Sequence, residues 1–253
     1  MKTYMRVSII LFVCMFSLFI RPAFSADSES DSDEYSEFLD ELEEEEEEAG
    51  QVSVADPLYY WNKTMFHFND KLYFWLLKPA ATGYRAITPS PVRTCVKNFF
   101  TNLTTPVRFV NCLLQGKSEA AGVELGRFMV NTTFGVLGLG NPAEKEPKLK
   151  MPPDEDLGQT LGVYGIGNGF YIVWPILGPS TLRDSIGTFA DGFLAPVSYV
   201  EPVSASGGIE AFDMLNSLSF RIGDYEALKE SALEPYEAFR NAYIQYRTQK
   251  LKQ

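Results

Sequence analysis

The chain has 253 residues and a formal net charge of −11, from 22 Lys and Arg against 33 Asp and Glu. The charge is uneven: residues 1–26 hold three bases and no acid, residues 27–50 fourteen acids and no base, and residues 51–253 nineteen of each. A neutral domain without a basic patch lacks the electrostatic footprint of a DNA- or RNA-binding protein, so no nucleic acid is expected as a partner.

Residues 1–25 predict a cleavable signal peptide, and therefore export. Two bases precede an apolar stretch over residues 7–20, and Ala23 and Ser25 are small residues at the −3 and −1 positions of a cleavage site. The stretch is shorter than the roughly 20 residues that cross a bilayer, so an uncleaved anchor is the weaker alternative. Cys14 lies in the middle of the stretch and does not follow a small residue at its end, so lipidation is not expected.

Residues 26–54 are predicted to form a disordered acidic tether. The segment is nearly free of apolar side chains, so it cannot bury enough surface to offset the entropy lost on ordering. Calcium capture, or repulsion from an anionic membrane face, is the sharper alternative. The segment lacks the regular ligand spacing of a defined calcium loop.

The first helix of the neutral domain is predicted over residues 58–77, with Asp56 as its N-cap and Pro57 at its first position. Its aromatic rings fall on every face, which is more than one core-facing stripe requires. Either the helix is buried all round, or one face meets lipid, where Trp and Tyr favour the headgroup level. The candidate membrane-facing residues are Trp61, Phe66, Phe68, Phe74 and Trp75.

An αα-hairpin is predicted next. One helix ends near Phe100, residues 102–106 break it, and a second helix covers residues 107–114. Cys95 and Cys112 lie at similar distances on either side of the break, so antiparallel helices would bring them level. In an oxidising compartment a disulfide is then a candidate, and two buried free cysteines are the alternative.

The rest of the chain is read as helices separated by Gly and Pro. The further predicted helices cover residues 118–133, a short stretch from Asp154 toward Leu161, 181–191, 205–218, and Asp224 to the C-terminus with a kink or restart at Pro235. Strand signals are scarce and no internal repeat is visible, so the predicted class is mainly α.

Residues 162–179 stand apart from this pattern. Glycines come close together from Gly162 to Gly169, and the apolar run 170–177 follows them. The run is too short to span a membrane and too uninterrupted for a surface loop of a soluble protein. Two alternatives remain: a buried strand, or a hydrophobic loop that dips into lipid or a channel.

Signs of catalysis are weak. His67, the only histidine, lies between two phenylalanines and is expected to be packed, with no nucleophile at a recognisable spacing. The acids of residues 154–156 could pair for acid/base chemistry, but acids at a helix start mostly serve capping. The glycines lack the lysine and spacing of a phosphate-binding loop, and the few Cys and His lack metal-site spacing. No catalytic residue, metal or cofactor is therefore expected.

Short sequence strings occur through the neutral domain in a fixed order. They are Asp56-Pro57, Trp61-Asn62, Met65 to Asp70, Lys78-Pro79, Gly83-Tyr84-Arg85, Asn98-Phe99-Phe100, Asn111, Gln115-Gly116, Gly126-Arg127-Phe128, Asn131-Thr132-Thr133, Gly158 to Gly162 and Gly178 to Asp184. In this order they resemble the MlaA (VacJ) family, the outer-membrane component of a system that maintains lipid asymmetry in Gram-negative bacteria. The resemblance covers residues 55–247, nearly all of the predicted domain 55–253.

The resemblance implies a ring-like helical domain on the periplasmic side of the outer membrane, embedded in one leaflet, with an amphipathic central channel. Mislocalised phospholipids would leave the outer leaflet through it and pass to a periplasmic lipid carrier, and family members can associate with a trimeric porin. A glycine-punctuated loop is thought to control passage in the family. The matching loop or channel candidates here are Gly165, Gly167, Gly169, Phe170, Tyr171 and Trp174.

The sequence departs from the family pattern at its N-terminus. Many members are lipoproteins with a lipidated N-terminal cysteine, which this chain lacks, so membrane retention would rest on the aromatic surface or on the porin. The alternative function is a soluble periplasmic protein that binds lipid or acts as a scaffold in the cell envelope.

Overall fold

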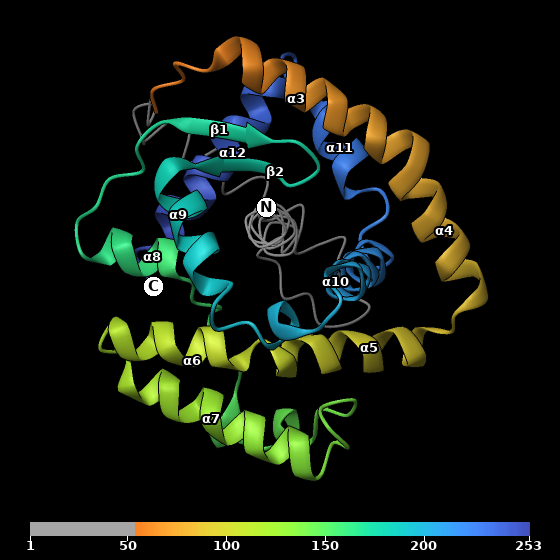
Figure 1. The fold of residues 1–253 in the computed structure, drawn as a ribbon, viewed down its shortest axis with the longest axis vertical. Helices are drawn as coiled ribbons and strands as arrows, with labels where there is room; N and C mark the ends of the chain where they lie inside the picture. Colours follow the sequence, from red (N-terminus) through yellow and green to blue (C-terminus); the bar gives the residue numbers. More distant parts are fainter. Residues whose placement is uncertain (1–53) are drawn as a thin grey trace.

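In the computed structural model, the described residues are 54–253, and their helices follow the outline of a ring (Figure 1). The predicted signal peptide, Cys14 and the acidic segment up to residue 53 lie outside this range. The mainly α prediction is confirmed, since the described part holds one short two-stranded sheet among its helices. No helix within residues 54–253 is both long and apolar enough to cross a membrane.

One side of the ring is a single helical rod made of α3 (Tyr59–Leu72), the π-helical turn η1 (Tyr73–Leu77) and α4 (Lys78–Ile87). Pro79 has no N–H and its ring displaces the carbonyl four residues earlier, which normally kinks or ends a helix. In this rod the Lys78 N–H donates to the Tyr73 carbonyl, five residues back, so a π turn absorbs the proline. The rod therefore continues ten residues beyond the predicted end at Leu77.

The helices α5 (Ser90–Leu103) and α6 (Thr105–Leu114) lie end to end along another side of the ring (Figure 1). Only Thr104 separates them, and its backbone stays near the helical region at φ −93°, ψ 1°. Its hydroxyl donates to the Phe100 carbonyl at 3.1 Å and accepts from Arg108 Nη1 at 3.0 Å. The predicted hairpin between these helices is therefore wrong, because the break at Pro106 only interrupts the line.

The disulfide prediction is also wrong. Cys95 is exposed, Cys112 is buried, and both are free. Helices that follow one another in line separate residues 17 positions apart by roughly 25 Å at 1.5 Å per residue. The alternative of two buried free cysteines is correct for Cys112 alone.

The actual hairpin is formed by α6 and α7 (Ser118–Thr133), which lie side by side (Figure 1). The turn between them passes through Gly116 at φ +75°, a conformation that glycine adopts without penalty. A buried ion pair joins the two helices: Arg108 Nε and Nη2 donate to the Glu124 carboxylate at 2.8 and 2.9 Å. Such two-point contact fixes the relative register of the helices.

The strands β1 (Tyr171–Trp174) and β2 (Gly178–Thr181) form an antiparallel pair, with Tyr171 opposite Thr181. The Asn62 side chain, from α3, donates to the Tyr171 carbonyl at 3.0 Å and accepts from the Val173 N–H at 2.7 Å. Tyr171 and Val173 pack with Tyr236 and other apolar side chains in the main hydrophobic cluster. Of the two alternatives for the apolar run, the buried strand is correct for β1.

The remaining elements complete the ring and partly fill it. The helices are α8 (Leu157–Val163), α9 (Leu182–Asp191), α10 (Val203–Leu218), α11 (Asp224–Ser231) and α12 (Pro235–Lys250), and the 3-10 turns are η2 (Pro142–Lys145), η3 (Pro147–Leu149) and η4 (Pro196–Tyr199). Pro235 is the first residue of α12, so the last predicted helix restarts there. The helix α10 lies inside the outline and contacts α4 and α5 (Figure 1).

The distribution of apolar and polar side chains is inverted relative to a water-soluble domain. Among the described residues, more polar and charged side chains than hydrophobic ones are buried. Large apolar side chains stand outside, including Tyr60 (86% exposed), Ile87 (82%) and Trp75 (78%). Soluble monomers rarely expose extensive apolar surface, so this exterior indicates contact with an apolar partner or medium.

Candidate functional site

Three of the predicted membrane-facing residues lie on the outside of the rod. Trp61, Phe68 and Trp75 are 48%, 46% and 78% exposed. The Trp61 indole N–H donates to the Val173 carbonyl at 3.2 Å, so its polar edge is held by the hairpin while part of its ring remains exposed. These three rings remain candidates for lipid contact.

The other two, Phe66 and Phe74, are half-buried and pack against side chains of α12 and α11, so they are less accessible to lipid than the first three. The Phe66 ring lies 5.9 Å from Tyr236, edge to face, and packs against the main hydrophobic cluster. The Phe74 ring lies 6.1 Å from Tyr225 on α11. The helices α11 and α12 cover this face of the rod, which a sequence pattern with rings on every face could not reveal.

The glycine loop lies between α8 and β1. Gly165 and Gly169 have positive φ, at +86° and +69°, which only glycine adopts readily. A Cβ on Gly169 would lie 2.9 Å from the Leu182 Cβ, whereas Gly165 and Gly167 have open space around them. Replacement is therefore strained at Gly165, strained and crowded at Gly169, and sterically free at Gly167.

The loop is tied at both sides. The Tyr164 hydroxyl donates to the Leu114 carbonyl at the end of α6, and Arg183 Nη1 donates to the Ile166 carbonyl at 3.3 Å. Tyr164 and Ile166 are nevertheless 60% and 49% exposed. An exposed apolar tip on anchored ends is consistent with a loop at a lipid-handling surface.

The aromatic residues after the loop belong to the core or its edge. Tyr171 is 1% exposed inside the hydrophobic cluster, so its prediction as a channel residue is wrong. Burial, together with nearby Asp56, raises the pKa of its hydroxyl well above the usual value. Phe170 and Trp174 are half-buried, and the Trp174 indole N–H donates to Ser185 Oγ at 2.9 Å.

An ionic cluster lies beside the loop and joins α8, α9 and α12. The Arg247 guanidinium donates to both Asp156 oxygens at 2.6 and 2.9 Å and to both Asp184 oxygens at 2.8 and 3.0 Å. Arg183 and the Tyr243 hydroxyl also donate to Asp184. Burial disfavours the charge on Asp156, but Arg247 outweighs it, so the pKa of that carboxyl is lowered.

Two of the acids of residues 154–156, Glu155 and Asp156, are held in structural contacts. Asp156 caps α8, accepting from the Gln159 N–H at 2.8 Å, and α8 starts at Leu157, three residues after the predicted start at Asp154. Glu155 binds Lys117 at 2.6 Å and accepts from Gln115 at 2.8 Å. Both carboxylates are committed to positively charged or amide partners.

His67 is exposed, which corrects the expectation that it is packed. Among the described residues, the ring contact found for His67 is an edge contact with Phe66, whose ring centroid lies 5.6 Å from its own. Within residues 54–253, no three His, Cys, Asp or Glu side chains gather as a metal site.

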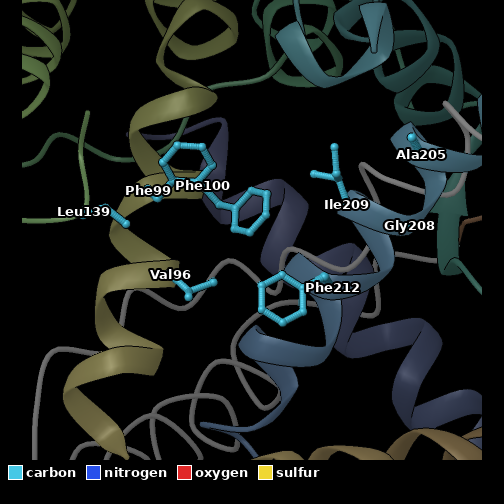
Figure 2. A pocket seen from close by; sticks show the side chains of 8 residues that line it. All are labelled: Val96, Phe99, Phe100, Leu139, Ala205, Gly208, Ile209 and Phe212. Carbon is cyan, nitrogen blue, oxygen red and sulfur yellow. The ribbon is translucent and has the colours of Figure 1, made fainter. Parts of the chain in front are cut away.

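An apolar cavity lies between α5 and α10 and has a volume of about 530 Å³, within the usual range of ligand pockets. Side chains of the two helices point toward one another across it (Figure 2). The Phe100 and Phe212 ring centroids are 6.4 Å apart. All lining residues are apolar: Val96, Phe99, Phe100, Leu139, Ala205, Gly208, Ile209 and Phe212.

Polar contacts fasten the two walls of this α5/α10 cavity. Arg93 Nη1, on α5, donates to the Ser219 carbonyl at 3.1 Å and to its hydroxyl at 2.9 Å. Asn216, on α10, donates to the Arg93 carbonyl at 3.1 Å and accepts from the Tyr84 hydroxyl at 2.9 Å. The cavity can therefore bind an apolar chain without collapsing, and it offers no group for acid, base or nucleophilic chemistry.

Sequence reasoning did not single out this cavity. Its α10 wall is Ala205, Gly208, Ile209 and Phe212, spaced i, i+3, i+4 and i+7, which is the signature of one helix face. The signal was present, but only the tertiary structure shows that this face meets α5 across a space.

Comparison with known proteins agrees with these features. The family model described as MlaA lipoprotein matches residues 54–250. The chain is 36% identical over 202 residues to the intermembrane phospholipid transport system lipoprotein MlaA of Escherichia coli (strain K12), covering 77% of this chain and 78% of that protein. It is also 32% identical over 240 residues to an uncharacterized protein of Rickettsia conorii, covering 94% and 91%.

A solved structure concerned with the maintenance of bacterial outer membrane lipid asymmetry superposes with a TM-score of 0.69 at 34% identity. It covers 78% of this chain and 99% of that chain. The family match extends over nearly all of the described residues and the fold agrees with it. The chain belongs to the MlaA family.

Proposed function

We propose that this protein removes mislocalised phospholipids from the outer leaflet of the outer membrane and passes them to a periplasmic lipid carrier. The family membership and the E. coli relative, named for intermembrane phospholipid transport, support this role. The observation that carries it in this chain is the α5/α10 cavity, which is lined only by apolar residues. Of its two walls, α5 belongs to the ring's perimeter and α10 lies inside it (Figure 1).

The mechanism is reversible burial without covalent change, so the protein is not an enzyme. A lipid chain that enters the cavity gains about 0.8 kcal/mol for each CH₂ removed from water. That gain is offset when the chain comes from a bilayer, which is already apolar, so the cavity can take up and release lipid. The exposed tip of the glycine loop, between α8 and β1, is proposed to control passage at a separate place on the ring, with Gly165, Gly167 and Gly169 allowing its movement.

The protein is proposed to lie on the periplasmic side of the outer membrane, after export with a cleaved signal peptide. Its exterior apolar surface, including Trp61, Phe68 and Trp75, would hold it in one leaflet around an amphipathic channel. A trimeric porin is the proposed membrane partner and a periplasmic lipid carrier the proposed acceptor. Retention would not depend on a lipidated cysteine.

Filling the cavity tests the proposal. A Cβ on Gly208 meets nothing within 4 Å, so Gly208→Phe should place its ring in the cavity without disturbing the backbone. Gly122→Phe is the matched control, since Gly122 is also helical and open but lies on α7, away from the cavity. Cells that depend on each variant are compared for phospholipid exposed in the outer leaflet.

We expect Gly208→Phe to let phospholipid accumulate as in cells without the protein, and Gly122→Phe to behave as wild type. If the Gly208→Phe protein is present at the normal level and keeps outer-leaflet phospholipid as low as wild type does, lipid does not pass through this cavity. Normal asymmetry in cells without the protein would favour the scaffolding role instead.

A further inference from the structure

A loop with exposed apolar side chains follows α7. It comprises residues 134–140, and Phe134, Val136 and Leu137 are 80%, 68% and 65% exposed. The helix α7 lies outside α6 at the edge of the ring, and the loop continues from its end (Figure 1). Neither the α5/α10 cavity nor the glycine loop uses these three side chains.

Most of the N–H groups of this loop donate to carbonyls of the chain. The N–H groups of Leu137 and Gly138 donate at 3.0 Å to carbonyls of the last turn of α7, and those of Leu139 and Gly140 donate to carbonyls inside the loop. A surface loop in water does not require this, because water can accept from its N–H groups. In hydrocarbon each unpaired backbone group is costly, so pairing within the chain lowers the free-energy cost of inserting this loop.

The loop is also held in a strained and fixed shape. Val136 and Leu137 have φ of +54° and +58°, a region that residues with a Cβ seldom occupy and a β-branched residue least of all. Close backbone packing leaves no room for change: a Cβ on Gly138 would lie 2.5 Å from the Asn102 Cβ, and one on Gly135 2.4 Å from the Asn131 carbonyl oxygen. The shape directs apolar side chains outward, as at a site kept for function.

The surface around this loop is apolar and uncharged, which indicates the chemistry of its partner. Residues 128–143 contain no charged side chain. Leu125 and Met129, one turn apart on α7, are 45% and 60% exposed and extend the apolar surface along that helix. A protein partner would usually exchange about one hydrogen bond per 100–200 Å² of interface. The side chains of residues 134–140 offer no donor or acceptor, which suits lipid chains.

We propose that residues 134–140 insert into the hydrocarbon of the bilayer as a fixed anchor. The inference rests on the proposed function in one respect, that the protein sits in a membrane. It adds a specific point of insertion through Phe134, Val136 and Leu137, next to the α5/α10 cavity that Leu139 of the same loop lines.

Site-specific fluorescence tests the anchor. Leu137→Cys is labelled with an environment-sensitive probe in a full chain whose Cys14 and Cys95 are serine, and Lys145→Cys, exposed on the adjacent turn η2, is the control. Burial of Cys112 raises the pKa of its thiol to about 11, so it does not compete for label. The protein is placed in vesicles of phosphatidylethanolamine and phosphatidylglycerol, with and without bromine on the acyl chains.

We expect the probe at position 137 to shift to the blue and to be quenched by acyl-chain bromine, and the probe at position 145 to do neither. Phe134→Ser with Leu137→Ser should lower vesicle affinity at least about tenfold with an unchanged circular dichroism spectrum. A probe at 137 that stays accessible to aqueous iodide on vesicle-bound protein overturns the anchor alone. Protection only after a porin is added identifies a protein contact and also overturns it. Failure of the protein to bind vesicles at all overturns both the anchor and the proposed membrane location.

Discussion

At the scale of single residues, the family strings include buried polar side chains that join elements distant in sequence. Asn62 pairs with β1, Asn111 donates to Asp191 at 2.8 Å, and Asp184 lies in the ionic cluster with Arg247. A ring that exposes apolar residues has little apolar core to hold it. Polar contacts in its interior, each with defined geometry, take over that role.

Arg247 is the residue whose loss should affect stability most. Arg247→Met removes the cation that faces Asp156 and Asp184, and leaving buried charges unpaired destabilises by about 3–5 kcal/mol. Arg240→Met is the control, since Arg240 lies 3.7 Å from Asp56 and is partly exposed, so about 1 kcal/mol or less is expected. Urea unfolding in detergent measures both.

A second substitution tests the cause. Adding Asp184→Asn to Arg247→Met should recover part of the loss, because one unpaired charge is removed. Equal free energies of unfolding for Arg247→Met and Arg240→Met would show that the cluster contributes no more than a surface pair.

At the scale of elements, the sequence predicted most helices but not how they meet. Helix starts depend on local signals, so the starts of α8, α9 and α12 were predictable within a few residues, at Asp154, at residue 181 and at the restart at Pro235. The hairpin between α5 and α6 was wrong because Pro106 breaks hydrogen bonds without setting a direction. The cavity walls were not identified because amphipathic spacing shows that a helix has an apolar face, but not which helix that face meets.

The in-line arrangement of α5 and α6 predicts different reactivity for two thiols. Cys95 is exposed and should react with iodoacetamide in the folded protein, whereas Cys112 is fully buried and has a pKa raised by burial to about 11. Because thiolate is the reactive form, Cys112 should react only after unfolding. Peptide mass mapping after labelling, with and without urea, measures this. A disulfide-linked peptide containing both cysteines under non-reducing conditions would contradict the arrangement and restore the hairpin.

At the scale of the whole molecule, many of the buried side chains are polar and many large apolar side chains are exposed. Residues 51–253 carry no net charge. The net charge of −11 comes from the fourteen acids of residues 27–50 and the three bases of residues 1–26, and not from the ring. Neutrality and an aromatic exterior suit a body seated in lipid, where an unpaired charge is costly. The predicted neutral, aromatic domain was accessible from composition. Composition could not show which aromatic side chains are buried and which are exposed, because that depends on where α11 and α12 pack.

Retention in the membrane should therefore depend on the exposed rod and not on a lipidated cysteine. Trp75, Leu76 and Ile87 are 78%, 58% and 82% exposed, and replacing all three by serine removes apolar surface without emptying the core. If each side chain contributes about 1 kcal/mol of partial burial in lipid, the triple variant should lose roughly 100-fold in vesicle affinity. Cosedimentation with vesicles measures this, and an unchanged urea midpoint shows that the fold is intact. Equal retention of variant and wild type would show that the rod does not face lipid, and wild-type protein wholly in the soluble periplasm would favour the soluble lipid-binding or scaffolding alternative.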